Sequence, residues 1–154
     1  MAAHQGFSEV NRVPEQRVCY RVFAFNRVGD SPASTIDCVT PPSPVDDLVA
    51  TPAGNGSIDL TWSNPSAVTT GYSIQYLELV YPGYGGYCYY YYGCYPYYRW
   101  TEITRTGPEA TSYRVTGFAS GAAHDFIVVT LAPKAVADAS PVASSETEPP
   151  PPSE

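Results

Sequence analysis

The sequence offers few side chains that could act as a catalytic acid, base or nucleophile. Only His4 and His124 could supply an imidazole base near neutral pH, and His124 fits better as a partly buried structural residue. No serine–histidine–aspartate set, G-x-S-x-G segment or H-E-x-x-H pair is present, and the carboxylates are scattered through turns. We therefore predict a protein that is not an enzyme and that holds no metal ion and no cofactor.

The four cysteines carry the clearest covalent chemistry of the chain. They fall as two local pairs, Cys19 with Cys38 and Cys88 with Cys94. Four cysteines allow three connectivities, and the sequence alone does not choose among them, although each sequential pair sits inside one hairpin or loop. Zinc is the competing interpretation, but neither spacing is the short paired one of structural zinc sites. Two disulfides are the favoured interpretation, and they indicate an oxidising, extracellular setting.

Tyrosine is concentrated in one segment, because residues 81–98 carry ten of the fourteen tyrosines of the chain. Each ring is a rigid apolar surface with a polar tip, and such residues are enriched at binding surfaces. The alternative is that the rings fold back on their own domain as a satellite core. We predict an interaction surface that contains eight of them: Tyr84, Tyr87, Tyr89, Tyr90, Tyr91, Tyr92, Tyr95 and Tyr97.

Asn55, Gly56 and Ser57 have the pattern of an N-glycosylation site. The segment falls in a predicted turn, from which an oligosaccharide would project into water. The alternative is that Asn-Gly is simply a favourable hairpin turn. Asn55 is therefore a candidate glycosylation site, and attachment of glycan there stays open.

The composition narrows the fold class and the partners. Sixteen prolines and twelve glycines favour short strands joined by turns, and no long amphipathic helical stretch is visible. A net charge of −7 argues against nucleic acid and against an anionic membrane surface. No apolar run approaches the length of a membrane span, so we expect no membrane insertion.

Two parts of the chain resemble the fibronectin type III family. The phrase VCYRVFAFNRVGDSPAS, followed by Cys38 and by Pro41-Pro42, resembles the last two strands of that family. The phrases VDDLVAT, IDLTW, GYSIQY and TSYRVTGF then resemble a complete second domain. The resemblance implies an all-β, immunoglobulin-like β-sandwich, in which Trp62 lies between the sheets.

The resemblance also implies a domain organisation. Residues 1–42 would be a partial domain with strands E, F and G, and residues 43–147 a complete domain. That second domain carries a Tyr/Gly-rich insertion at 80–98, and residues 148–154 form a Pro-rich acidic tail. In the partial domain, strand E is expected at 7–13, strand F at 18–25 and strand G at 35–39. In the second domain, the segment KAVADAS is expected in the F–G loop.

The partial domain cannot be stable on its own. Strand F alternates so that one face should point into a sandwich: Val18, Tyr20, Val22 and Ala24. Ordering its residues costs on the order of 60 kcal/mol, whereas a Cys19–Cys38 bridge contributes only about 3 kcal/mol. The cover must come from preceding chain, from a neighbouring copy or from the second domain and its tyrosine segment.

These observations lead to an extracellular structural protein, expected to be a subunit of a self-assembling fibre or surface array. Strands of one copy would complete the unfinished sandwich of the next, so the partners are copies of the chain itself. The alternative is an adhesion or binding module of a larger secreted protein, with the tyrosine segment binding glycan or protein.

Overall fold

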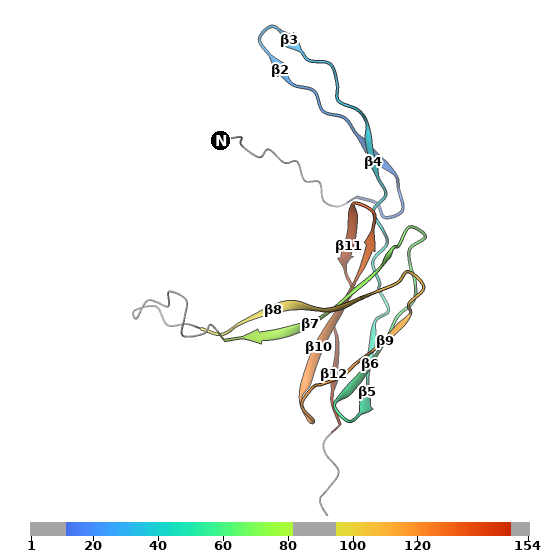
Figure 1. The fold of residues 1–154 in the computed structure, drawn as a ribbon, viewed down its shortest axis with the longest axis vertical. Helices are drawn as coiled ribbons and strands as arrows, with labels where there is room; N and C mark the ends of the chain where they lie inside the picture. Colours follow the sequence, from blue (N-terminus) through green and yellow to red (C-terminus); the bar gives the residue numbers. More distant parts are fainter. Residues whose placement is uncertain (1–11, 82–94, 149–154) are drawn as a thin grey trace, which may run out of the picture.

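The computed structural model describes residues 12–81 and 95–148, and these residues form strands and turns with no helix among them. Figure 1 shows a sandwich from which two narrow two-stranded arms project. The strands, in chain order, are β1 (Val18–Tyr20), β2 (Phe25–Asn26), β3 (Gly29–Asp30), β4 (Asp37–Val39), β5 (Val49–Gly54), β6 (Ser57–Thr61), β7 (Gly71–Val80), β8 (Tyr97–Thr106), β9 (Ser112–Val115), β10 (Ala123–Ala132), β11 (Ala135–Ala139) and β12 (Ala143–Glu146).

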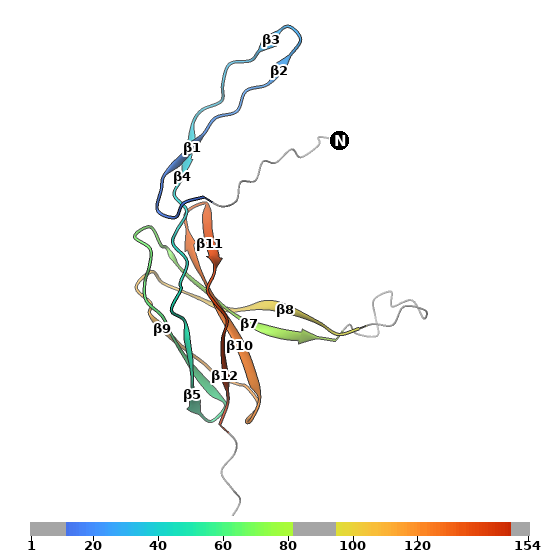
Figure 2. The ribbon, with the colours of Figure 1, turned by 180° about the vertical axis from the view of Figure 1, so that it is seen from behind.

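Strands β5 to β12 form the sandwich. A five-stranded sheet has the order β11-β10-β7-β8, with β12 also paired to β10, and a three-stranded sheet has the order β5-β6-β9. Figure 2 shows the two sheets face to face, seen from behind. The arrangement confirms the predicted all-β sandwich.

The core lies between the two sheets and is built from alternate residues of their central strands. Fully buried apolar side chains of these strands include Ile58 and Leu60 on β6, Tyr72 and Ile74 on β7, and Phe126 and Val128 on β10. Trp62 follows β6 directly, is 5% exposed, and packs edge-on against Tyr72 with the ring centroids 5.5 Å apart. These inward-facing side chains explain why each strand takes its register, since a shift by one residue would turn them to the outer face of the sheet.

The turn between β5 and β6 shows how local sequence determines the fold. Asn55 and Gly56 both adopt left-handed backbone conformations, with φ of 52° and 69°, as a tight hairpin turn requires. A Cβ atom on Gly56 would lie 2.3 Å from the carbonyl oxygen of Phe118. Only glycine fits there, so the Asn-Gly pair has a structural role.

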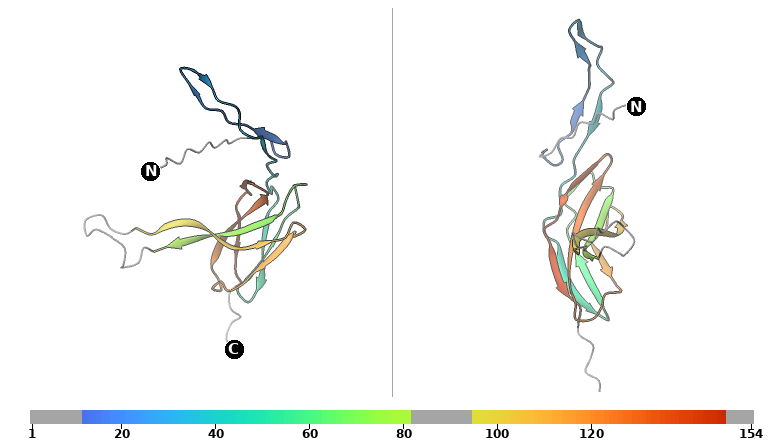
Figure 3. Two further views of the ribbon diagram at one scale, coloured as in Figure 1. Left: turned by 45° about the horizontal axis from the view of Figure 1, so that its top comes forward. Right: turned by 90° about the vertical axis from the view of Figure 1, so that its left-hand side faces the viewer.

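The N-terminal ribbon, residues 18–40, is a hairpin that stands outside the sandwich (Figure 3). Its strands pair as β1 with β4 and β2 with β3. The expected strand 18–25 is therefore interrupted, and the expected strand 35–39 is shortened to β4. Of the expected strand 7–13, residues 7–11 lie outside the described residues, and residues 12 and 13 are not in a strand.

The interruption has a local cause, because two serine side chains replace part of the strand ladder. The backbone N–H of Val22 donates to Ser34 Oγ at 2.9 Å, and that of Ala24 donates to Ser31 Oγ at 2.9 Å. In return, the backbone N–H groups of the two serines donate to the carbonyl oxygens of Val22 and Ala24. The two strands stay together while the regular ladder is lost.

The base of the ribbon is attached to the sandwich by polar contacts. The carboxylate of Glu15 accepts hydrogen bonds from the Ser43 backbone N–H at 3.1 Å and from the Ser66 hydroxyl at 2.6 Å. These bonds, that of Ser66 foremost, lower the pKa of Glu15. The ammonium of Lys134 lies 2.5 Å from a carboxylate oxygen of Asp37. The direction of the ribbon relative to the sandwich is therefore fixed at several points.

The tyrosine segment begins and ends in regular strands. β7 runs through Val80 and β8 starts at Tyr97, and these two residues pair with each other. The ends of the expected insertion 80–98 thus lengthen a hairpin, and residues 82–94 between them lie outside the described residues.

The expected F–G loop KAVADAS is also mostly strand, because residues 135–139 form β11 against β10. The turn shrinks to Pro133 and Lys134, the latter with φ of 62°.

Candidate interaction surfaces

The N-terminal ribbon exposes much of its apolar surface. The fraction exposed is 72% for Val22, 50% for Phe23 and 80% for Phe25. Of the predicted strand-complementation face, Val18 and Tyr20 are half-buried, whereas Val22 and Ala24 are exposed. Val22 and Ala24, the half of the predicted face nearer the tip of the hairpin, are therefore open to solvent, as are all residues from 21 to 37.

The ribbon is built in the same way as the last hairpin of the sandwich. Ser140 N–H donates to the Val128 carbonyl at 3.0 Å, Val128 N–H donates to Ser140 Oγ at 3.0 Å, and Ser140 Oγ donates to the Pro141 carbonyl at 2.9 Å. Ser31 makes the same three bonds with Ala24 and Pro32, at 2.8, 2.9 and 3.0 Å. The ribbon is therefore the geometric counterpart of β10 and its two partner strands.

The two hairpins differ in what covers them. In the sandwich, Val128 and Phe126 are 0% exposed, because β7 pairs beside them and β6 packs over them. In the ribbon, the counterpart of Phe126 is Val22, which is 72% exposed. The ribbon thus has the form of two strands of a sandwich, and no strand in the described part of the chain buries its inner face.

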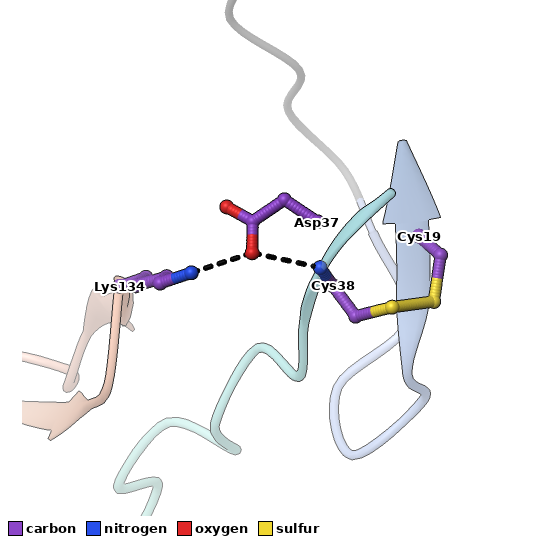
Figure 4. Close-up of a disulfide and its surroundings, with 4 residues drawn as sticks. All are labelled: Cys19, Asp37, Cys38 and Lys134. Carbon is purple, nitrogen blue, oxygen red and sulfur yellow. Dashed lines mark hydrogen bonds and ion pairs between the residues drawn. A yellow bond between two sulfur atoms is a disulfide. The ribbon is translucent and has the colours of Figure 1, made fainter. Parts of the chain in front are cut away.

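A disulfide joins the two strands at the base of the ribbon. Cys19 and Cys38 are directly opposite in the β1–β4 pair, and their Cα atoms are 4.0 Å apart (Figure 4). Asp37, the neighbour of Cys38, accepts the bond from Lys134 in the same view. The bridge ties the ribbon together beside its attachment to the sandwich. The second predicted pair, Cys88 and Cys94, lies outside the described residues.

β7 and β8 form a second arm where they extend beyond the sandwich. We call residues 76–81 and 95–101, which contain this part of the two strands, the aromatic arm. Opposite residues of an antiparallel pair share a face. One face contains Leu77 with Trp100 and Leu79 with Tyr98. Tyr98 is 67% exposed and Trp100 36% exposed. This face lies on the side of the sheet that points away from the core.

The opposite face of the aromatic arm contains Tyr97 beside Val80, together with a charged pair whose charges are satisfied. Arg99 lies directly opposite Glu78 and contacts its carboxylate at 3.0 Å. The hydroxyl of Thr101 donates to the same carboxylate at 2.7 Å, and the bonds from Thr101 and then Arg99 lower the pKa of Glu78. Because these charges are paired on one side, the apolar side is the one that lacks a partner within the described residues.

The predicted tyrosine surface is described only at its ends. Tyr95 is 80% exposed, and Tyr97 is 50% exposed beside Val80. The remaining residues of that set lie outside the described residues: Tyr84, Tyr87, Tyr89, Tyr90, Tyr91 and Tyr92. The sequence reasoning did not include Leu79 and Trp100 in the surface, although alternation along 77, 79 and 81 is a signal that could have found the apolar face.

The other predicted residues take structural positions. His124 stacks on Phe118 with the ring centroids 4.0 Å apart, and its Nε2 atom is buried without a hydrogen-bond partner in the structure. Burial lowers the pKa of His124, against a smaller opposing effect of Asp125. Asn55 is exposed at the tip of the β5–β6 turn, where an oligosaccharide would meet no obstacle from the turn itself.

Within residues 12–81 and 95–148, no three histidine, cysteine or acidic side chains come together in a way that could hold a metal ion. The same residues include no helix of the length and apolarity that crossing a membrane requires.

No protein-family model and no curated protein matches the sequence. Solved structures do match the fold. A structure titled FN3tt is 16% identical, with a TM-score of 0.53, and covers 71% of this chain and 98% of its own. The fibronectin type III domain of a human fibronectin type III domain containing protein 3 is 22% identical, with a TM-score of 0.52, and covers 75% and 96%.

A third structure, the FN1–FN3 domains of chicken CNTN1, is 15% identical with a TM-score of 0.51 and covers 88% of this chain and 44% of its own. The two-sheet topology, the buried Trp62 and these likenesses agree. The chain has the fibronectin type III fold.

Proposed function

We propose that the protein is an extracellular structural subunit that assembles with copies of itself into a fibre or surface array. In each contact, strands of one copy complete the uncovered N-terminal ribbon of the next. The observation that carries this proposal is the ribbon itself, whose inner face is exposed at Val22 while its counterpart in the sandwich is fully buried. A contact between two different surfaces of the same chain does not close, and it therefore propagates.

The attachment of the ribbon supports this role. Glu15 and Lys134 hold its base against the sandwich at hydrogen-bond distance, and the Cys19–Cys38 bridge holds its two strands together. A rigid projection loses little conformational freedom on association, which favours binding. The disulfide also supports an extracellular setting, since such bridges persist in oxidising compartments.

A native sizing experiment tests the proposal. Sedimentation velocity of the oxidised chain over a wide concentration range should give a ladder of species that grows with concentration. A matched sample in mild reductant shows whether assembly requires the Cys19–Cys38 bridge of the ribbon. Tryptophan fluorescence of that sample checks that the sandwich stays folded. A single monomeric species at every concentration would contradict self-assembly and would favour a monomeric module.

The aromatic arm supports a second candidate function, that of an adhesion or binding module. Tyr81, Tyr95 and Tyr98 are each at least 67% exposed, and aromatic rings of this kind stack well on sugar rings and on protein surfaces. A monomeric chain that binds soluble polysaccharides, and loses that binding after Tyr98→Ser, would favour this function. The control Val136→Ser alters an exposed apolar residue on β11, at the far edge of the same sheet.

A further inference from the structure

We propose that the strand that completes the ribbon is β8 of another copy, so that the N-terminal ribbon of one molecule docks along the aromatic arm of the next. This inference rests on the proposed self-assembly and names the two surfaces that meet. Its first basis is that both surfaces are unpaired strand edges on the same chain. Among residues 12–81 and 95–148, β8 pairs only with β7, and the ribbon strands pair only with each other.

The hydrogen bonding of the ribbon shows which of its edges is open. Val22 and Ala24 direct both their backbone N–H and C=O groups to the partner strand, through Ser34 and Ser31. In an extended strand, the residues between them direct theirs to the opposite side. Arg21 and Phe23 therefore present backbone donors and acceptors at the free edge, which is the arrangement that strand addition uses.

The lengths of the two edges match. β8 has ten residues, and residues 18–26 of the ribbon are nine. At about 3.3 Å per residue, these are edges of about 33 Å and about 30 Å. An added ribbon would extend the five-stranded sheet of the sandwich at its β8 edge.

Charge distinguishes the two surfaces and favours a contact between unlike ones. Residues 12–40 hold four of the eight cationic side chains of the chain: Arg12, Arg17, Arg21 and Arg27. Within the described residues, Arg17, Arg21 and Arg27 form no ion pair, whereas every cation of the sandwich is paired with a carboxylate. Residues 45–148 hold four cations and ten carboxylates. Residues 12–40 also hold the carboxylates of Glu15, Asp30 and Asp37, so their net charge is +1, whereas that of residues 45–148 is −6. The ribbon of one copy is therefore attracted to the sandwich of another.

The aromatic arm offers exposed rings that the guanidinium groups of Arg17, Arg21 and Arg27 can contact. The rings of Tyr97, Tyr98 and Trp100 on β8 are at least 36% exposed, and the only arginine of the arm, Arg99, is already paired with Glu78. A guanidinium over an aromatic face is attracted to it, and the attraction strengthens as water is excluded. Phe23 and Phe25 of the ribbon would be covered in the same contact.

The contact must form between molecules. In the views of Figures 1 and 3 the ribbon and the aromatic arm leave the sandwich in different directions. The base of the ribbon is also held by Glu15 and Lys134, so it cannot swing across the sandwich to its own arm while those contacts persist. Each copy then offers one ribbon and one arm, and the assembly grows from both ends.

Two variants that each retain one surface test the proposal. Phe23→Pro removes a donor from the free edge of the ribbon and leaves the bonds of Val22 and Ala24 in place. Tyr98→Lys removes an exposed ring from the arm and adds a charge that repels the ribbon. Val28→Ser and Val136→Ser are the matched controls, since both residues are exposed and neither lies on the proposed contact.

The expected result in sedimentation velocity is distinctive. Each variant alone stays monomeric, with association weakened at least about tenfold, as for loss of one central contact residue. An equal mixture forms a dimer of twice the chain mass and nothing larger, because the intact arm of one binds the intact ribbon of the other. Tyr98→Glu, which also loses the ring but attracts arginine, should associate more strongly than Tyr98→Lys.

The other outcomes each overturn the inference. Assembly of Phe23→Pro alone means that arms bind arms, and assembly of Tyr98→Lys alone means that ribbons bind ribbons. If the mixture stays monomeric while the wild type assembles, and circular dichroism shows that both variants are folded, the contact lies elsewhere on the protein. Self-assembly itself then stands. Wild type that remains monomeric at every concentration overturns both the inference and the proposed function. If Phe23→Pro does not fold, Arg21→Glu replaces it as the ribbon variant.

Discussion

Ser31 in the ribbon and Ser140 in the sandwich make the same three hydrogen bonds. Each serine forms two bonds with a residue of the facing strand and donates its hydroxyl to the carbonyl of the proline that follows the serine. Their surroundings differ, because Ser140 is 5% exposed and Ser31 is in solvent. The same local sequence therefore builds the same bend in a covered hairpin and in an uncovered one. The pair offers a direct comparison of the same bond in two environments.

We expect Ser140→Ala to destabilise the sandwich, because the buried N–H of Val128 loses its acceptor. An unsatisfied buried donor costs about 1–3 kcal/mol. Ser31→Ala is the matched control and should change the free energy of unfolding by less than about 0.5 kcal/mol, since water can replace the hydroxyl at an exposed site. Urea unfolding of both variants measures the difference. Equal costs would contradict the assignment of Ser140 as the buried counterpart.

Trp62 should be the most costly aromatic side chain to truncate. It is 5% exposed and contacts Tyr72, so Trp62→Ala should cost about 3–5 kcal/mol. Its Nε1 atom has no hydrogen-bond partner in the structure, and Trp62→Phe should therefore cost much less because no bond is lost. Chemical denaturation checks both values. Native fluorescence that an aqueous quencher reaches freely would show that Trp62 is not in the core.

Much of this core follows from the sequence, because alternation along β6, β7 and β10 is a local pattern that burial enforces. Ile58, Ile74 and Phe126, one on each of these strands, all lie in the core. The interruption of the ribbon could not be foreseen in the same way, because it depends on the Ser31 and Ser34 hydroxyls accepting bonds from backbone N–H groups of the facing strand, which the alternation of side chains does not reveal. The length of the β7–β8 arm was also missed, since the insertion was placed at 80–98, whereas Val80 pairs with Tyr97 in regular strands.

His124 should make the stability of the sandwich depend on pH. Burial lowers its pKa below the ordinary value of 6.5, so the unfolded chain binds the proton more readily than the folded one. The free energy of unfolding is therefore full above pH 6.5 and falls as the pH drops through the lowered value. His124→Phe should flatten this slope below about pH 6.5. A slope that persists in the variant would exclude His124 as its source.

Gly56 should tolerate no side chain. A Cβ atom there would lie 2.3 Å from the Phe118 carbonyl oxygen, and the backbone has a φ of 69°. We expect Gly56→Ala to lower the free energy of unfolding by more than about 1 kcal/mol, through strain and displacement of the neighbouring loop. Gly107→Ala is the control, because no atom lies within 4 Å of its Cβ position. Thermal unfolding of the two variants should separate them clearly.

The central claim is that the free edge of the ribbon is covered when the chain assembles. Hydrogen–deuterium exchange at the backbone amides of Arg21 and Phe23 measures this directly, in dilute monomer and in the concentrated species. The account predicts fast exchange of both amides in the monomer and strong protection in the assembly. The amide of Val28, which donates to Asn26 Oδ1 within the tip, is an internal reference whose exchange should not change on assembly. Assembled protein in which Arg21 and Phe23 exchange as fast as in the monomer would contradict the account.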